Sequence, residues 1–184
     1  MPNEVGGCCR RFEELERERL ELVGELGKWP AKRLSFRPAE GAWSAVEVLD
    51  HVVRVESLTI GDLREGLRRP HAVGEGERPK IAELERALRS DKKFRVPAGQ
   101  GGIYPEAQTT WAEVMERWNE ARKELRGMLE SMGPEEVQLG VFEHPYAGWM
   151  TVEEVLKHFS DHLYHHQFQL ERLRASWADG VESR

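Results

Sequence analysis

Two histidines in the last quarter of the chain are spaced for metal binding. His162 and His166 stand four positions apart, and in a helix this spacing puts their Cβ atoms about 5–6 Å apart on one face. Two imidazoles placed in this way can converge on one divalent ion, with each nitrogen about 2.0–2.1 Å from the metal. The alternative is a pair of histidines that packs inside a helical protein without an ion. Each ring would then need its own hydrogen-bond partner, because an unsatisfied buried polar group costs roughly 1–3 kcal/mol.

A third histidine, His51, lies in a distant segment that also has helical periodicity. Apolar residues recur there at three- and four-residue steps, and His51 shares their face. A single histidine in such a position is most often part of the core. Together with the pair, however, it supplies the three protein ligands of an open metal site. Two carboxylates of the same segment, Glu47 and Glu56, are candidates for a catalytic base, although Glu47 is first of all a helix cap.

Four further residues are candidates for a supporting role around this site. His158 lies one turn before the histidine pair and is either a fourth ligand or outer partner, or a histidine that packs without such a role. Gln169, one turn beyond the pair, has the reach to orient a ligand ring, but as a surface residue it would need no role. His144 and Tyr146 lie in an irregular stretch, where lining a pocket mouth and packing a turn are both open.

Long helices must position these residues, and three helix starts carry the same signature. In each, Ser or Thr precedes Glu by three residues at the head of an apolar-periodic run: Ser44 and Glu47, Thr110 and Glu113, Thr151 and Glu154. This pattern is the capping box, in which the hydroxyl and the carboxylate each satisfy a backbone N–H group of the first turn. We therefore expect a helix to begin directly after each cap.

The hydrophobic periodicity predicts an all-α four-helix bundle. The four long helices are expected at residues 10–27, 45–69, 111–132 and 152–176. A long crossover joins the second helix to the third, and within it residues 81–90 are compatible with a short helix. Glycine and proline then indicate a loop over residues 92–105. Residues 137–149 are expected to form an irregular loop or a small hairpin.

The composition excludes several classes of function. The chain has 184 residues with 27 Lys+Arg against 33 Asp+Glu, a formal net charge of −6, which argues against nucleic acid as a partner. No apolar run approaches the roughly 18 residues of a membrane span, and the first residues lack the apolar stretch of a secretory signal. Cys8 and Cys9 form no disulfide framework, so we expect a cytoplasmic protein. The bundle should be one domain of residues 10–176, with a flexible N-terminal tail at 1–9 and a C-terminal tail at 177–184.

Three stretches of the sequence resemble the DinB-like (YfiT-type) superfamily. They are WSAVEVLDHVVRVE from Trp43, HPYAGWMTVEEV from His144 and HLYHHQFQ from His162. The resemblance covers most of the chain in element order. It implies a four-helix bundle that binds one divalent ion, with zinc or nickel the usual suggestions. The three family ligands then correspond to His51, His162 and His166.

The resemblance also implies a range of activities. The superfamily includes thiol S-transferases that use low-molecular-weight thiols such as bacillithiol or mycothiol, and a maleylpyruvate isomerase branch. We therefore expect a metal-dependent enzyme, a hydrolase or a thiol S-transferase, that acts on a small-molecule substrate. The alternative is a non-catalytic metal-binding or dimerisation module, because apolar side chains on more than one helix face leave room for a homodimer interface.

Overall fold

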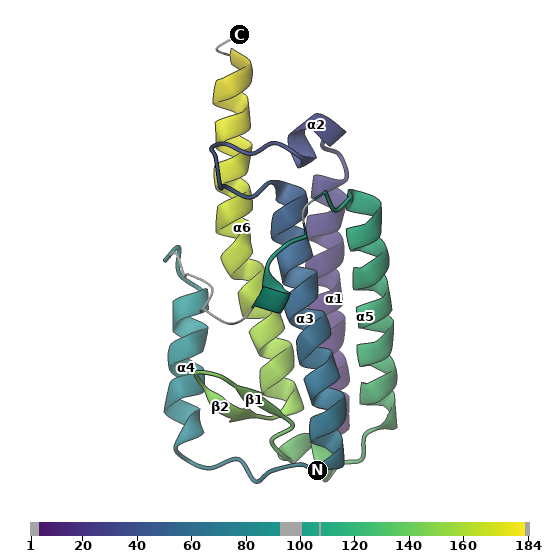
Figure 1. Ribbon diagram of the computed structural model, residues 1–184. Coiled ribbons are helices and arrows are strands. Elements are labelled where there is room, and N and C mark those ends of the chain that lie inside the picture. The colour runs from purple at the N-terminus through teal and green to yellow at the C-terminus, as the bar shows by residue number, and fades with distance from the viewer. Residues whose placement is uncertain (1–3, 93–100, 107, 183–184) are drawn as a thin grey trace.

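Four long helices dominate the computed structural model, which describes residues 4–92, 101–106 and 108–182 (Figure 1). They are α1 (Glu4–Leu26), α3 (Ala45–Arg68), α5 (Trp111–Ser131) and α6 (Val152–Glu182). Helix α1 packs against α5 and α6, and α3 packs against the same two helices. Helices α3 and α5 run in the same direction, because the chain returns along the bundle between them (Figure 1). The predicted bundle and its long crossover are therefore confirmed.

Shorter elements decorate the bundle. They are α2 (Ala31–Leu34), α4 (Glu77–Leu88), the 3-10 helices η1 (Gly101–Ile103) and η2 (Glu136–Gln138), and the strands β1 (Phe142–His144) and β2 (Gly148–Met150). The short helix expected at 81–90 is α4, which begins four residues earlier and packs against α6 and β2. The stretch 137–149 forms most of an antiparallel hairpin, which ends one residue later at Met150, the partner of Phe142. The 3-10 helix η1 and the strand β1 lie beside α3, and β2 lies beside α6.

All three predicted capping boxes are formed. At the start of α3, the backbone N–H of Ser44 donates to the Glu47 carboxylate at 2.8 Å, and the N–H of Glu47 donates back to the Ser44 hydroxyl at 3.4 Å. Thr110 and Thr151 make the same reciprocal bonds with a Glu three residues later. Because these bonds are local, they fix the starts of the three helices.

Both ends of the bundle contain more helix than the sequence predicts. Helix α1 begins at Glu4, so the expectation of a flexible tail over residues 1–9 is wrong for residues 4–9. The reason is packing: Cys8 is only 2% exposed and belongs to the same apolar cluster as Phe12, one turn further on. At the other end α6 extends to Glu182. There Trp177 packs edge-on against Phe36, with ring centroids 5.3 Å apart, and this contact extends the helix into the expected tail.

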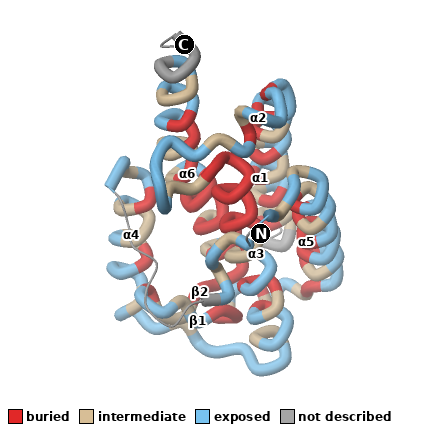
Figure 2. The backbone as a smooth tube through the Cα atoms, turned by 45° about the horizontal axis from the view of Figure 1, so that its top comes forward, coloured by how far each residue is buried: buried red, intermediate tan, exposed pale blue. Residues whose placement is uncertain are grey.

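The buried residues lie on the inward sides of the long helices (Figure 2) and form two apolar clusters. One includes Leu15, Leu63, Leu125 and Phe159, and the other includes Leu22, Leu49, Trp118 and Leu163. Burial of such side chains contributes roughly 1.5–3 kcal/mol each. No helix in the described part of the chain combines the length and the apolar character needed to cross a membrane.

A layer of buried polar groups lies between the two clusters. Glu56 of α3 is fully buried and accepts hydrogen bonds from Trp118 Nε1 and Arg122 Nη2 of α5, both at 2.8 Å. Arg19 of α1 lies over the Trp118 ring, 5.5 Å from its centroid, and also binds Asn119. Removing one partner from such a pair is strongly destabilising, because the other charge remains buried. This layer therefore fixes how α1, α3 and α5 fit together.

Candidate metal centre

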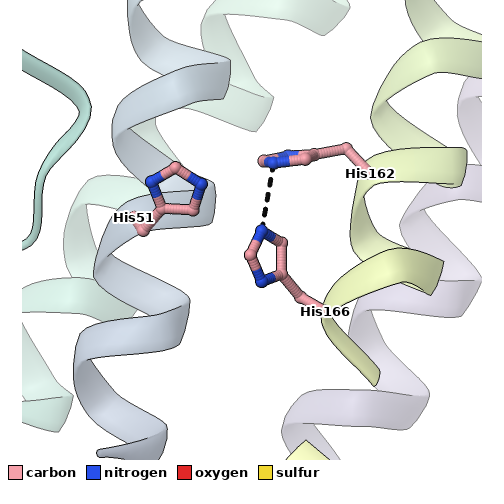
Figure 3. A group of neighbouring side chains, drawn as sticks. All are labelled: His51, His162 and His166. Atoms are coloured by element: carbon pink, nitrogen blue, oxygen red, sulfur yellow. Dashed lines mark hydrogen bonds between the residues drawn. The ribbon is translucent and has the colours of Figure 1, made fainter. Parts of the chain in front are cut away.

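The structure brings together the three histidines that the sequence singled out. His51 projects from α3, and His162 and His166 project towards it from α6 (Figure 3). Their side chains are buried, with exposures of 5%, 8% and 6% in that order. One ring nitrogen from each residue lies within 4.8 Å of the other two. Two helices far apart in the sequence thus supply three imidazole nitrogens that could hold one metal ion.

Hydrogen bonds on the far side of two rings determine which nitrogen is available. His51 Nδ1 lies 2.7 Å from the carbonyl oxygen of Ile103, and His166 Nδ1 lies 3.1 Å from Oε1 of Gln169. An oxygen of this kind only accepts, so each Nδ1 carries the proton and each Nε2 keeps a free lone pair. Outer partners of this type orient the ligands in metal sites. Gln169 thus makes the contact that its spacing suggested.

The contact between His162 and His166 tests whether the site fits an ion. Their Nε2 atoms are 3.1 Å apart (Figure 3), close to the separation of about 3.3 Å for two nitrogens bound to one tetrahedral zinc. Without an ion, His162 must donate its Nε2 proton to His166, and its Nδ1 is then a bare buried acceptor. The structure gives that Nδ1 no hydrogen-bond partner among the described residues. If the His162 proton lies on Nδ1 instead, the two Nε2 lone pairs face each other, and a divalent ion would take up both, so the residues fit a metal.

Burial keeps these imidazoles in the neutral form that binds metals. Desolvation lowers the pKa of His162 well below its usual value, and the neighbouring rings, His166 first, add to the effect. Desolvation, together with His51, lowers the pKa of His166 to about 3. The pKa of His51 is also lowered by burial. A metal therefore does not compete with protons for these nitrogens at neutral pH.

His158 and His144 continue the row of rings towards the hairpin. His158 is buried one turn before His162, with the two rings nearly parallel and 6.0 Å apart. The His144 ring lies 5.0 Å from that of His158. His144 Nδ1 accepts hydrogen bonds from the backbone N–H groups of Tyr146 and Ala147, both at 3.1 Å. His144 therefore packs the turn between the two strands, and Tyr146 is 49% exposed.

The two candidate carboxylates have other partners. The Glu47 carboxylate caps α3 and accepts from Nε of Arg37 at 2.8 Å. Burial raises the pKa of Glu47, but the hydrogen bonds from Ser44 and Arg37 outweigh this and hold it below the usual value. Glu56 is directed to α5, and burial raises its pKa in spite of the nearby arginine. The hydrogen bonds described for these carboxylates join them to helix starts and to α5, not to the three histidines.

The crossover supplies partners that the sequence reasoning missed. The Ile103 carbonyl, which accepts the hydrogen bond from His51 Nδ1, belongs to η1. This 3-10 helix lies inside the stretch expected to be a loop. Trp43, which precedes α3, also packs its ring against that of His51, with centroids 5.1 Å apart. A main-chain carbonyl leaves no trace in a sequence. Asp50, which accepts the backbone N–H of Glu106 in the same segment, can be noticed in the sequence. It is an acidic residue next to His51 in an otherwise apolar run.

Comparison with known proteins agrees with this geometry. Residues 14–170 match the family model of the DinB superfamily. The match extends from α1 into α6 and includes all three clustered histidines. Neither the curated proteins nor the solved structures give a match. Because the family model covers most of the sequence, and because a buried cluster of three histidines fits a metal-binding protein of this kind, the chain belongs to the DinB superfamily.

Proposed function

We propose that this protein is a metal-dependent enzyme that holds one divalent ion with His51, His162 and His166. The observation that carries the proposal is the convergence of three buried ring nitrogens within 4.8 Å of one another. Three protein ligands leave further coordination positions open, which is typical of catalytic rather than structural sites. The burial of all three rings also keeps them neutral and ready to bind.

Zinc and nickel are the proposed ions, because the resemblance to the DinB-like superfamily implies them and both accept imidazole ligands. The bound ion would supply Lewis acidity, which favours the deprotonated form of a coordinated water or thiol. The chain itself contributes orientation. Ile103 and Gln169 fix the rings of His51 and His166 by accepting their Nδ1 protons, and Trp43 covers the His51 ring.

The proposed substrate is a small molecule, and the proposed reaction is either a hydrolysis or the transfer of a low-molecular-weight thiol to an electrophile. Membership of the DinB superfamily supports this choice, since the superfamily that the sequence resembles includes thiol S-transferases. In a transfer, the thiol sulfur forms a bond to the electrophilic carbon, the leaving group departs with the bonding electrons, and the thiol proton is released. This reaction needs a nucleophilic sulfur that is deprotonated near neutral pH, which a divalent ion favours.

Metal content is the first test. The protein should be purified without a histidine tag, and its bound metal should be measured by mass spectrometry. We expect about one ion per chain and a loss of that ion in His162→Ala. His165→Ala is the matched control, because it removes the neighbouring imidazole, which lies outside the cluster. Stoichiometric metal that survives His162→Ala would refute the assignment.

Activity is the second test. Metal-free and metal-loaded protein should be incubated with a panel of low-molecular-weight thiols and an electrophile, and with simple esters and amides. We expect turnover that appears with metal and disappears in His162→Ala but not in His165→Ala. Turnover that is independent of metal would contradict the proposed role of the three histidines.

The second candidate is a non-catalytic metal-binding module, and one observation favours it. His51, His162 and His166 are all buried, with exposures of 5%, 8% and 6%. A buried ion with no route for a substrate would have a structural role. The two candidates separate on ligand exchange: an enzyme's ion should bind small thiols or azide with a change in the Co²⁺ spectrum, whereas a closed structural ion should not.

A further inference from the structure

A short segment of the crossover, residues 103–106, lies against the metal centre on the α3 side. The Ile103 carbonyl accepts the Nδ1 proton of His51 at 2.7 Å. The next residue, Tyr104, packs edge-on against Trp43 with centroids 6.3 Å apart, and Trp43 in turn packs against His51. Figure 1 shows η1, which ends at Ile103, beside the middle of α3. One ligand ring is thus held by a segment that is not part of the four long helices.

Asp50, the residue before His51, anchors the other end of this segment. It is fully buried, and its Oδ2 accepts the backbone N–H of Glu106 at 2.6 Å. Its Oδ1 accepts from Nη2 of Arg117 on α5 at 2.6 Å, and Nε of Arg54 donates to its Oδ2 at 3.0 Å. A carboxylate with three donors, two of them charged, is held in one orientation.

We propose that Asp50 is a positioning residue for the metal ligand His51, an inference that rests on the proposed metal site. Successive residues of a helix point about 100° apart, so Asp50 and His51 bind different points of the same short segment. Asp50 fixes Glu106, and three residues earlier the Ile103 carbonyl is held where it receives the His51 proton. The hydrogen bond between Asp50 and Glu106, which we call the clamp, thereby selects the tautomer of His51 that carries its proton on Nδ1 and leaves Nε2 free.

The order of segment 103–106 and the binding of the ion must stabilise each other. If segment 103–106 orients His51 for the ion, the bound ion must stabilise the segment by the same free energy. Hydrogen exchange can detect this in the unmodified protein. Metal binding should slow exchange at the backbone N–H of Glu106, whose hydrogen bond to Asp50 forms the clamp. The Trp149 amide of the hairpin is the internal reference.

Hydrogen exchange with and without Zn²⁺ is therefore the first experiment. We expect protection of the Glu106 amide to rise by about tenfold with zinc, and to stay unchanged at Trp149. The rise should disappear in His51→Ala, which removes the ring that links the segment to the ion. Equal exchange at Glu106 with and without bound zinc would overturn the inference.

Substitution of Asp50 is the second experiment, with Co²⁺ as the probe. Loss of an outer partner typically lowers metal affinity by about 10–100-fold. We expect Asp50→Ala to weaken Co²⁺ binding by roughly tenfold and to shift its visible absorption bands, and Asp50→Asn, which keeps one acceptor oxygen, to fall between Asp50→Ala and the native protein. Asp62→Asn is the matched control, because it removes the same charge from an exposed position of α3; it should leave both readouts unchanged.

The outcomes separate this inference from the proposed function. If the native protein binds no Co²⁺, the metal site itself is wrong. If the native protein binds Co²⁺ and loses it in His162→Ala, the metal site stands. An Asp50→Asn protein that is folded by circular dichroism, and whose affinity and spectrum equal those of the native protein, then overturns the role of Asp50 alone.

Discussion

The buried ring of His158 makes the stability of the folded protein depend on pH in a way that one substitution can isolate. Burial, with a further contribution from His144, lowers the pKa of His158 to about 3, whereas a histidine in an unfolded chain has a pKa of about 6.5. Between these values the unfolded state binds a proton that the folded state does not. Titration of His158 therefore does not reduce the free energy of unfolding above about pH 6.5. It lowers that free energy progressively as the pH falls from 6.5 towards 3.

The size of the effect follows from the two pKa values. Between pH 7 and pH 5, protonation of one histidine in the unfolded chain lowers the free energy of unfolding by about 2 kcal/mol. The folded protein binds no compensating proton at this position, because His158 is buried, 8% exposed, and stays neutral at pH 5. His166, whose pKa is also about 3, adds a similar amount that the substitution of His158 leaves in place.

The assay is urea unfolding of the metal-free protein, followed by circular dichroism at pH 7 and pH 5. We expect the loss of unfolding free energy between these pH values to be about 2 kcal/mol smaller in His158→Leu than in the native protein. Leu156→Val is the control, since Leu156 is a fully buried apolar residue of the same helix. It should lower stability by about 1 kcal/mol at both pH values. An equal loss in the native protein and in His158→Leu would refute the reasoning.

Other perturbations test the packing around the site. Glu56→Leu should lower the free energy of unfolding by about 3–5 kcal/mol in urea titrations, because it leaves Arg122 buried without its counter-charge. Ser44→Ala should cost about 1 kcal/mol through loss of the α3 cap, and a conservative exchange to Thr should recover most of it. Gly66→Ala should lower stability by about 1–3 kcal/mol or more, because a Cβ there would lie 1.8 Å from the carbonyl oxygen of Val141; an unchanged midpoint would contradict this close approach. Zinc at 100 times its dissociation constant should raise the unfolding free energy by about 2.7 kcal/mol, and His162→Ala should abolish the rise in melting temperature.

The parts of the fold that could be predicted from the sequence are those determined by local interactions. A hydroxyl and a carboxylate three residues apart form a capping box within one turn, so Ser44, Thr110 and Thr151 marked three helix starts directly. The start of α1 could not be found in this way. It depends on Cys8 joining a cluster that includes residues of α5 and α6, and such distant packing overrides the low helix propensity of Gly6 and Gly7.

The same distinction between local and distant interactions applies to the candidate site. His162 and His166 were found because one helix determines their separation, and His51 because it shares an apolar face of another helix. The partner of His51 is a main-chain carbonyl, and every residue carries that group. Its position depends on a crossover without hydrophobic periodicity, anchored by the contact of Asp50 with Glu106. The cluster of three histidines was therefore predictable, whereas the main-chain carbonyl that binds His51 was not.

Helix geometry also explains why the two carboxylates of α3 do not occupy equivalent places. Glu56 follows His51 by five residues, so its side chain is rotated by about 140° around the helix. His51 faces α6, and this rotation turns Glu56 to α5, where Arg122 and Trp118 bind it. Glu47 precedes His51 by four residues, a rotation of only about 40°, but it lies in the first turn and its carboxylate caps the helix. A carboxylate of α3 that shared both the face and the level of His51 would have to lie within the turn around it. Asp50 lies in that turn, and its three hydrogen bonds hold the crossover against His51 rather than leaving a free base beside the proposed metal site.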